Sequence, residues 1–550
     1  MKRDAPNTYG WLERFLLPAL LAAYGFIQIR GLLIPSLWSD EAYDGVFTQR
    51  IIHLGWRGFR QWPLGIGPYN YHAALQSYLY VPFFLLIKSP FLALRVGEFF
   101  FSSVVIVLAY LCARRFFGPL AALFTLVLLL FNPVFIYMSR INTPHGGIMA
   151  AFWLGALLFL QTWRKTGQDR WLFAAAFLTG AGFCVRIWFY WFIFGLLFSA
   201  LVVYGREIMA LFFRPLNRRR IIGSGISFLS GLVPYILNAM YGYHNHENLF
   251  RVGVTCFHYS LCSANNFTIL SNWGVSLWQF LGALAGGMWD ILPYYPLVHD
   301  GFITFMMIYC GFLLALSAAI LLFWKATRGT RRRKALLFVA LLVGMLLPSC
   351  LTISNFRQDH LYFIFPLPQI IMGAAAAVLF DHAWAARPCA KTLCLALLLF
   401  IAAPVLYLRE YSRLESYLHL TGGTGEVSDS IIAITGWLEK HNYLFPIACD
   451  WGFECPIQLL SGGKINPLPH GYNFDADHGF LFRHPGGGGI YLFYTAQGNL
   501  KFASMALARQ GLALDILKTF YTKNGEPNAV ACAVIKHGRS FRAGNFPAAN

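Results

Sequence analysis

Runs of apolar residues long enough to cross a lipid bilayer recur along this chain. The first of them, FLLPALLAAYGFIQI, starts at Phe15, and a membrane-spanning helix needs roughly 20 predominantly apolar residues. The 550 residues are 57% hydrophobic, with a mean hydropathy of +0.54. This composition excludes an ordinary soluble domain. We therefore predict an α-helical polytopic membrane protein.

About eleven segments have the length and composition of spanning helices. They are residues 15–35, 91–112, 119–138, 145–163, 170–186, 188–205, 221–240, 302–324, 335–353, 361–380 and 392–408. Two further apolar stretches, 75–88 and 268–290, are either juxtamembrane helices or additional spans. The expected total is therefore about 11–13 transmembrane helices.

The basic residues predict how the chain is oriented in the membrane. The net charge is +19, but Lys and Arg gather in short loops such as ARRFFG and KATRGTRRRK. Such loops lie on the cytoplasmic side under the positive-inside rule, and this distribution argues against nucleic acid as a partner. The first apolar run follows Lys2, Arg3 and Arg14 and has no small-residue cleavage site, so we expect a retained helix with a cytoplasmic N-terminus.

The C-terminal region has a different composition, and an odd number of spans places it outside the cytoplasm. We expect a transmembrane domain over residues 1–408 and a soluble extracytoplasmic α/β domain over 409–550. The elements predicted within the second domain are helices at 427–441 and 503–519 and strands at FPIACD, GIYLFYT and AVACAVI. Two cysteine pairs on the same side, Cys256/Cys262 and Cys449/Cys455, either form disulfides or stay free.

An acidic cluster directly follows the first apolar run. In WSDEAYDG, Asp40 and Glu41 are adjacent and Asp44 is close by. One interpretation is that a carboxylate here is a general base that removes a proton from an attacking hydroxyl. The other is a hydrated loop, since carboxylates are easily accommodated in water just outside the membrane. The charges alone leave both interpretations open.

The order of motifs in this part of the chain is similar to that of a known family. WSDEAY is followed by His72 with an aromatic helix, by Arg95 in the next span, and by ARRFFGPLAALFTLVLLLFNPVFIYMSR. This set resembles the GT-C membrane glycosyltransferases, in particular the bacterial relatives of protein O-mannosyltransferases and of the lipid A aminoarabinose transferase. The resemblance covers residues 10–205 well. It continues more loosely through FRQDHLYFIFPLP and the C-terminal α/β region.

The resemblance implies an enzyme, with a GT-C-like fold, in a bacterial inner membrane, and it implies that the first external loop, residues 36–90, is catalytic. A sugar would pass from a polyprenyl-phosphate carrier, with inversion, to a hydroxyl of a glycan, lipid or protein at the outer membrane face. Asp40 matches the acidic residue that engages the acceptor, and Glu41 is its neighbour. The membrane lipids would surround the carrier. Because the cytoplasmic loops are all short, no domain for a nucleotide-sugar donor is visible.

Basic side chains are needed where the lipid phosphate leaves, and Arg suits this task because its planar fork binds phosphate oxygens bidentately. The candidates for donor phosphate binding are Arg357, Arg186, Arg140 and His72. Each arginine lies at the end of a predicted span, so the alternative is an anchor at the level of the lipid headgroups. Further candidates for the substrate loop are Asp44, His145, His360 and Tyr362.

The sequence departs from the family pattern at two places. The external-loop histidine is followed by Ala73 and Ala74, whereas relatives often have a Pro pair, and the segment SRINTPHGG lacks the second acidic residue. This second difference favours a different sugar or acceptor. The motif HNHE, with His244, His246 and Glu247, has a spacing that can hold a divalent metal. No other cofactor is indicated, and the metal is left open, because a lone run of this kind in a loop more often faces solvent than binds a metal.

Two other functions are compatible with a polytopic chain. A transporter or flippase for a lipid-linked substrate predicts two matching halves with interrupted helices and charges near the bilayer midplane. A non-catalytic membrane-anchored binding protein predicts that Asp40 can be replaced without consequence. About eleven spans exceed what anchoring requires, and we therefore favour the glycosyltransferase.

Overall fold

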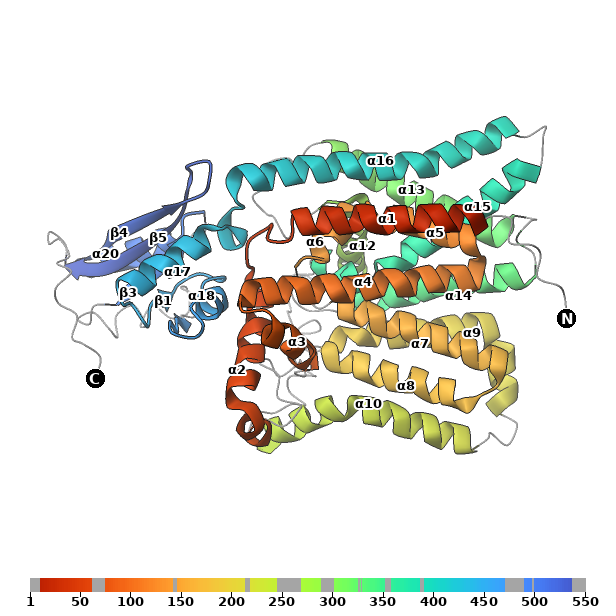
Figure 1. Ribbon diagram of the computed structural model, residues 1–550, viewed down its shortest axis with the longest axis horizontal. Coiled ribbons are helices and arrows are strands. Elements are labelled where there is room, and N and C mark those ends of the chain that lie inside the picture. Colours follow the sequence, from red (N-terminus) through yellow and green to blue (C-terminus); the bar gives the residue numbers. More distant parts are fainter. Residues whose placement is uncertain are drawn as a thin grey trace. The chain divides into compact units, whose positions relative to one another are not determined.

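The computed structural model consists of helices followed by a small mixed sheet (Figure 1). It describes residues 10–61, 75–141, 146–212, 218–244, 269–287, 301–324, 327, 329–351, 358–385, 390–469, 489–496 and 499–536. The chain forms two compact units. The first unit comprises Met1–Arg30, His53–Leu79 and Gly97–Ser412, and the second comprises Gly31–Ile52, Tyr80–Val96 and Arg413–Asn550. The second unit therefore combines the C-terminal region with the segment that carries the acidic pair.

The first unit is helical, and each of the predicted spans overlaps at least one helix. The helices that lie in it wholly or in part are α1 (Gly10–Arg30), α2 (Ser39–Gln61), α3 (Leu75–Leu86), α4 (Pro90–Phe117), α5 (Pro119–Leu130), α6 (Pro133–Met138), α7 (Gly146–Thr166), α8 (Asp169–Val185), α9 (Tyr190–Phe212), α10 (Arg218–His244), α12 (Ile269–Ala285), α13 (Gly301–Phe323), α14 (Thr330–Leu346), α15 (Pro366–Ala385) and α16 (Ala390–Thr421). Short 3-10 turns η1 (Ile187–Phe189), η3 (Leu347–Leu351) and η4 (Gln358–Ile364) connect some of them.

Several helices have the dimensions of membrane spans. Within the described residues, five are both long and apolar enough to cross a bilayer: Leu12–Arg30, Pro90–Phe117, Gly146–Thr166, Arg218–Leu237 and Gly301–Phe323. The predicted span 119–138 is divided into α5 and α6. Asn132 caps α6, because its side chain accepts from the backbone N–H of Val134 at 2.9 Å, and Pro133 occupies the first helical position. Both residue types favour the start of a new helix.

Glycines bring pairs of these helices into close contact. α8 packs along α10, where a Cβ on Gly180 would lie 2.1 Å from the carbonyl oxygen of Phe228 and one on Gly231 would lie 2.2 Å from that of Phe177. α9 and α14 meet in the same way at Gly195 and Gly344. Van der Waals packing through small residues drives helix association where water is absent. These pairs give the first unit a fixed scaffold.

The sheet of the second unit has the strand order β2-β1-β3-β5-β4. Its strands are β1 (Ile447–Ala448), β2 (Leu468–Pro469), β3 (Ile490–Tyr494), β4 (Leu512–Tyr521) and β5 (Pro527–Lys536). β1 pairs in parallel with β2 and β3, whereas β5 is antiparallel to both β3 and β4. Helices α17 (Ser430–Lys440), α18 (Glu454–Leu460) and α20 (Asn499–Ala508) accompany the sheet.

Both faces of this sheet carry a hydrophobic core. Along β3, Leu492 and Tyr494 pack with residues of α17 and α18, whereas Tyr491 and Phe493 pack with Ala503 of α20. Successive side chains of a strand point to opposite faces. A strand that is covered on both faces is apolar throughout, and all five residues of β3 are buried. The sequence therefore encodes three layers, helix, sheet and helix.

One predicted element of this region is wrong. Residues 503–519 were expected to form one helix, but α20 ends at Ala508 and β4 begins at Leu512. Gly511 has a φ of +69°, a left-handed conformation that ends the helix. Pairing with β5 then overrides the helix propensity of Leu and Ala in this stretch. The predicted helix at 427–441 and the three predicted strands are present.

Candidate active site

The acidic pair lies at the start of α2 in the second unit. α2 begins at Ser39, so Asp40 and Glu41 both occupy its first turn. Acidic side chains are favourable at this end of a helix, because the N-terminus carries a partial positive charge. The loop predicted from sequence is thus a helix whose first turn holds both carboxylates.

Glu41 is fixed in a buried ion pair with Arg95 of α4. The distance between Arg95 Nη2 and Glu41 Oε1 is 2.6 Å, and neither side chain is exposed to solvent. Glu41 Oε1 also accepts a hydrogen bond from the backbone N–H of Trp38 at 2.8 Å. Arg95 Nη2 donates to the carbonyl oxygens of Pro35 and Ser36 at 3.0 Å each. The pair therefore ties the chain before α2 to the beginning of α4.

Asp40 and Asp44 differ from Glu41 in their exposure. The Asp40 side chain is half-buried, whereas Asp44, one turn further along α2, is only 1% exposed. The backbone carbonyl of Asp44 accepts a hydrogen bond from the Thr48 hydroxyl at 2.8 Å. Of the three predicted carboxylates, Asp40 is the one that solvent and a substrate can reach most readily.

Helix α18 packs against α2 at Gly45. A Cβ on Gly45 would lie 2.8 Å from a Leu459 methyl and 3.0 Å from one of Leu94, so the three elements meet where α2 has no side chain. Burial raises the pKa of the Cys455 thiol well above its usual range, and the carboxylates of Glu454 and Asp40 add to this effect. The C-terminal fold and the acidic helix therefore share one electrostatic environment.

In the first unit, one of the predicted site residues is a buried arginine. Arg140, just after α6, is fully buried. Its Nε donates to Gln28 Oε1 at 3.1 Å, and its Nη2 donates to the Ile27 carbonyl at 2.9 Å and to the Tyr411 hydroxyl at 3.2 Å. The guanidinium also lies 5.0 Å from the ring centre of Tyr137, a cation–π arrangement. Residues from α1, α6 and α16 thus orient this cation.

Tyr362 contacts Ser139, the residue that precedes Arg140. Its hydroxyl is 3.1 Å from that of Ser139, and the side chain is only 2% exposed. The buried carboxylate of Glu98 is within electrostatic range of Tyr362 and of Tyr24. Tyr362 was predicted to be a substrate-loop residue, and it belongs to this buried polar cluster.

The other two predicted residues that can be described, Arg186 and His360, come together around Trp188. The Arg186 guanidinium lies 4.2 Å from the Trp188 ring centre, and the rings of Trp188 and His360 are 3.9 Å apart and nearly perpendicular. Arg186 ends α8, Trp188 belongs to η1, and His360 belongs to η4, which also carries Tyr362. The element η4 therefore connects both groups of predicted residues.

Several predicted residues lie outside the described part of the chain. These are His72, His145, Arg357, His246 and Glu247, together with the side chain of His244 and the pair Cys256/Cys262. Within the residues that the structure describes, no group of three or more His, Cys, Asp or Glu could hold a metal ion. The second cysteine pair can be described: Cys449 and Cys455 are both buried and free.

The sequence argument gave no site role to Arg95, Glu98, Gln28 or Tyr411. Arg95 and Glu98 interrupt the apolar run of α4, and ionisable residues within membrane helices are rare and usually functional. That signal was present in the sequence. Gln28, by contrast, is an ordinary residue near the end of α1, and Tyr411 is one within α16, so only the fold brings them to Arg140.

The second unit also contains a buried carboxylate that no motif indicated. Asp450 follows β1 and is fully buried; its Oδ2 accepts from the Tyr494 N–H at 2.7 Å and its Oδ1 from Asn499 Nδ2 at 2.5 Å. Burial raises the pKa of Asp450 to about 6, although these hydrogen bonds oppose the shift. Asp450 connects the ends of β1 and β3 to the start of α20.

Comparison with known proteins finds solved structures of similar fold and a family that part of the chain resembles. Residues 71–216 match the family described as dolichyl-phosphate-mannose-protein mannosyltransferase. The structure of ArnT from Cupriavidus metallidurans in the apo state is similar with a TM-score of 0.57 and 13% identity, covering 95% of this chain and 98% of that chain. The structure of the same protein bound to undecaprenyl phosphate has a TM-score of 0.56 and 14% identity, with the same coverage of both chains. No curated protein sequence matches.

A further structural similarity involves an oligosaccharyltransferase from Archaeoglobus fulgidus, tethered with an acceptor peptide that contains an NVT sequon. Its TM-score is 0.51 at 14% identity, covering 92% of this chain and 70% of that chain. Together, the fold and the membrane-length helices define a multi-pass membrane protein whose fold is similar to that of ArnT. The similarity to the dolichyl-phosphate-mannose-protein mannosyltransferase family covers residues 71–216 of this chain.

Proposed function

We propose that this chain is an inverting glycosyltransferase that moves a sugar from a polyprenyl-phosphate donor to a hydroxyl of a glycan, lipid or protein. The observation that carries this proposal is the different environment of two neighbouring carboxylates. Glu41 is fully buried against Arg95, whereas Asp40 is half-buried on the same helical turn. This difference supports Asp40 as the general base and Glu41 as a residue that holds the turn in place.

In the proposed reaction, Asp40 accepts the proton of the acceptor hydroxyl as its oxygen attacks the anomeric carbon from the face opposite the phosphate. The bond between the anomeric carbon and the phosphate oxygen breaks, and polyprenyl phosphate leaves with the electron pair. General base catalysis of this kind contributes roughly 10² to 10⁴ in rate. Attack from the opposite face inverts the configuration at the anomeric carbon.

The leaving phosphate needs cations, and we assign this role to Arg140 and Arg186, with Arg357 and His72 as the other sequence-based candidates. Arg140 is oriented by Gln28 and Tyr411, and Arg186 by Trp188. Guanidinium groups bind phosphate oxygens through charge-assisted hydrogen bonds, which are about twice as strong as neutral ones. His360 and Tyr362, on η4, would contact the substrate beside them.

The proposed reaction takes place at the outer face of a bacterial inner membrane. The basic loops support a cytoplasmic N-terminus, and an odd number of spans then exports the region from 409 to 550. We propose that 1–408 is the membrane domain and 409–550 the soluble domain. The packing of α18 on α2 around Gly45 supports a role of the soluble domain in positioning Asp40.

The test compares membranes that contain wild type, Asp40→Asn or Glu41→Gln, each supplied with a panel of polyprenyl-phosphate sugars and an extract of exported glycans. Asn keeps the size of Asp and removes its charge. We expect wild type to consume one donor and Asp40→Asn to lose about a hundredfold or more in kcat at unchanged thermal stability. Glu41→Gln should instead lower the thermal stability.

The result also separates the other functions. If no donor is consumed by wild type, but lipid-linked sugar crosses the membrane of vesicles that contain the protein, the chain is a transporter. If Asp40→Asn transfers sugar as fast as wild type, the general-base assignment is wrong. Equal losses of activity in the two variants, at equal stability, would mean that the two carboxylates act together.

A further inference from the structure

The hydroxyl of Tyr24, in α1, is a buried polar group without a hydrogen bond. The side chain is 3% exposed, and within the described part of the chain its hydroxyl oxygen has no hydrogen-bond partner. A buried hydroxyl without a partner costs free energy, because it has lost its contact with water. Such groups are rare in folded proteins, and a bound ligand or an ordered water commonly explains them.

The polar side chains beside Tyr24 already bond to other groups. Ser139 has one hydroxyl hydrogen, which it donates to a backbone carbonyl of α6 at 2.6 Å. Gln28 donates to another carbonyl of α6 at 3.0 Å and accepts from Arg140 Nε at 3.1 Å. Glu98 is within electrostatic range of Tyr24, but no hydrogen bond joins the two side chains. The Tyr24 hydroxyl therefore keeps a proton to donate.

The packing of α1 places this hydroxyl beside Arg140. The Tyr24 ring lies 6.1 Å from the rings of Phe99 in α4 and Phe135 in α6, which fix its direction. Gln28, which holds the Arg140 guanidinium, is one turn further along the same face of α1. Side chains of a helix lean toward its N-terminus, so Gln28 leans toward Tyr24. The hydroxyl and the guanidinium are within electrostatic range of each other.

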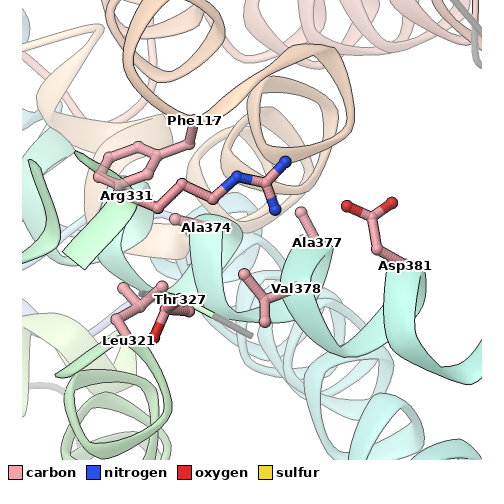
Figure 2. Close-up of a pocket in the computed structure, with 8 residues that line it drawn as sticks. All are labelled: Phe117, Leu321, Thr327, Arg331, Ala374, Ala377, Val378 and Asp381. Atoms are coloured by element: carbon pink, nitrogen blue, oxygen red, sulfur yellow. The ribbon is translucent and has the colours of Figure 1, made fainter. Parts of the chain in front are cut away.

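Other polar groups of this unit reach water instead. Figure 2 shows Arg331 and Asp381 beside a pocket that is lined by residues of α4, α13, α14 and α15. Arg331 is exposed and Asp381 is partly exposed. The volume of the pocket, about 20 Å³, holds about one water molecule. Solvent hydrates these side chains, whereas the buried hydroxyl of Tyr24 needs a partner that is brought to it.

We propose that the Tyr24 hydroxyl donates a hydrogen bond to a phosphate oxygen of the polyprenyl-phosphate donor, beside Arg140. This inference rests on the proposed function and adds one residue to its phosphate site. An anionic oxygen is the acceptor that suits this place, because the donor proton of Tyr24 and the charge of Arg140 both attract it. A neutral phenol next to a guanidinium then binds the phosphate without adding a charge of its own.

The hydrogen bond strengthens as the reaction proceeds. In the donor, the phosphate is a diester with one negative charge. When its bond to the anomeric carbon breaks, the electron pair stays on the phosphate oxygen, and the proton of the acceptor hydroxyl goes to Asp40. The polyprenyl phosphate that leaves therefore gains a second negative charge. A donor that is aimed at developing charge stabilises the transition state more than the ground state.

Tyr24→Phe removes the hydroxyl and keeps the ring. In sugar transfer by the full-length protein in detergent, kcat should fall about tenfold to a hundredfold, and KM for the donor should change less. The melting temperature should rise by about 1–4 °C, since the variant no longer buries a hydroxyl without a partner. A residue with only a structural role would not combine lower activity with higher stability.

Tyr407→Phe is the matched control. This tyrosine is also buried, but its hydroxyl donates to the Leu284 carbonyl at 2.7 Å. Its loss leaves a buried carbonyl with one hydrogen bond fewer, so the melting temperature should fall and kcat should equal that of wild type. The two substitutions make the same chemical change and are expected to have opposite effects on stability.

The proposal is overturned if Tyr24→Phe transfers sugar as fast as wild type. It is also overturned if the melting temperature of Tyr24→Phe falls, since the hydroxyl would then have a partner within the protein, such as an ordered water. Binding of undecaprenyl phosphate to wild type, Tyr24→Phe and Arg140→Gln separates these results from failure of the proposed function. If Arg140→Gln alone binds the lipid less tightly, only the assignment of Tyr24 fails. If wild type neither binds the lipid nor transfers sugar, both proposals fail.

Discussion

The two units each bury an arginine completely, but they hold it in different ways. In the second unit, Arg95 faces the carboxylate of Glu41 at 2.6 Å. In the first unit, Arg140 donates to an amide, a carbonyl and a phenol, those of Gln28, Ile27 and Tyr411. The carboxylate is charged and also fixes the backbone around Arg95, whereas the three groups described for Arg140 are neutral and orient its guanidinium. The two arginines therefore differ in the chemistry of these described partners, a charged one for Arg95 and neutral ones for Arg140.

Asp450 adds a third kind of buried charge, in the second unit. Its described hydrogen bonds come from a backbone N–H and from the Asn499 amide. Because these donors oppose the desolvation only in part, burial raises the pKa of Asp450 to about 6. Burial is equally complete for Asp450, Glu41 and Arg140. The chemistry of the neighbours, rather than the depth, therefore decides what each charge can do.

Breaking the ion pair should have the largest effect on stability. In Arg95→Met, Glu41 stays buried without this cation, and removal of one partner of a buried pair costs about 3–5 kcal/mol. Thermal unfolding of the purified protein measures this loss. The double variant with Glu41→Met and Arg95→Met is the control, and it should recover most of the stability because neither charge remains. A double variant as unstable as the single one would show that the pair contributes more than charge balance.

Asp450 predicts a dependence of stability on pH. Its folded-state pKa of about 6 lies above the ordinary value of 3.8, so the folded protein binds the proton more tightly than the unfolded chain. The stabilisation is complete below about pH 4 and is lost as the pH rises through about 6, by up to about 3 kcal/mol. Protection of the β3 amides from hydrogen exchange, corrected for intrinsic rates, should fall over this interval.

Asp450→Asn is the matched control for this dependence. The amide has nearly the shape of the acid and does not titrate near these pH values, so the protection of β3 should no longer fall between pH 4 and 6. Protection that rises with pH in wild type would mean that Asp450 is stabilised as the carboxylate. The prediction would then be wrong in sign, and the hydrogen bonds from Tyr494 and Asn499 would outweigh the desolvation.

Arg140 should respond differently from Arg95. If its charge binds the donor phosphate, Arg140→Gln lowers kcat/KM for the polyprenyl-phosphate sugar about tenfold to a hundredfold, in line with about 1.5–3 kcal/mol for a hydrogen bond to a charged group. Arg140→Lys keeps the charge and should retain more activity than Gln. If Arg140→Gln and Arg140→Lys lose equal amounts of kcat/KM and show an equal drop in melting temperature, the role of Arg140 is to pack with Tyr137 and Tyr411.

The sequence was sufficient for some of these features and insufficient for others. Apolar runs identify helices because a spanning segment must satisfy its backbone internally, and WSDEAY identifies the acidic turn. Which carboxylate is buried in an ion pair was not predictable, since adjacent residues on a helix point roughly 100° apart and Arg95 is 54 positions from Glu41. The strand β4 was missed for a similar reason, because its partner β5 decides its conformation.

The contact between α18 and α2 gives the smallest predicted effect, and its sign is informative. Gly45→Ala places a methyl group 2.8 Å from a Leu459 methyl carbon, and overpacking costs about 1–3 kcal/mol, partly offset by the roughly 0.5–1 kcal/mol that Ala contributes in a helix. Gly436→Ala in α17 is the control, since nothing lies within 4 Å of its Cβ. We expect thermal unfolding to show a loss of about 1 kcal/mol for the first and a small gain for the second. If both variants are more stable than wild type, α18 moves to accommodate the added methyl group. The C-terminal fold would then not constrain the position of Asp40.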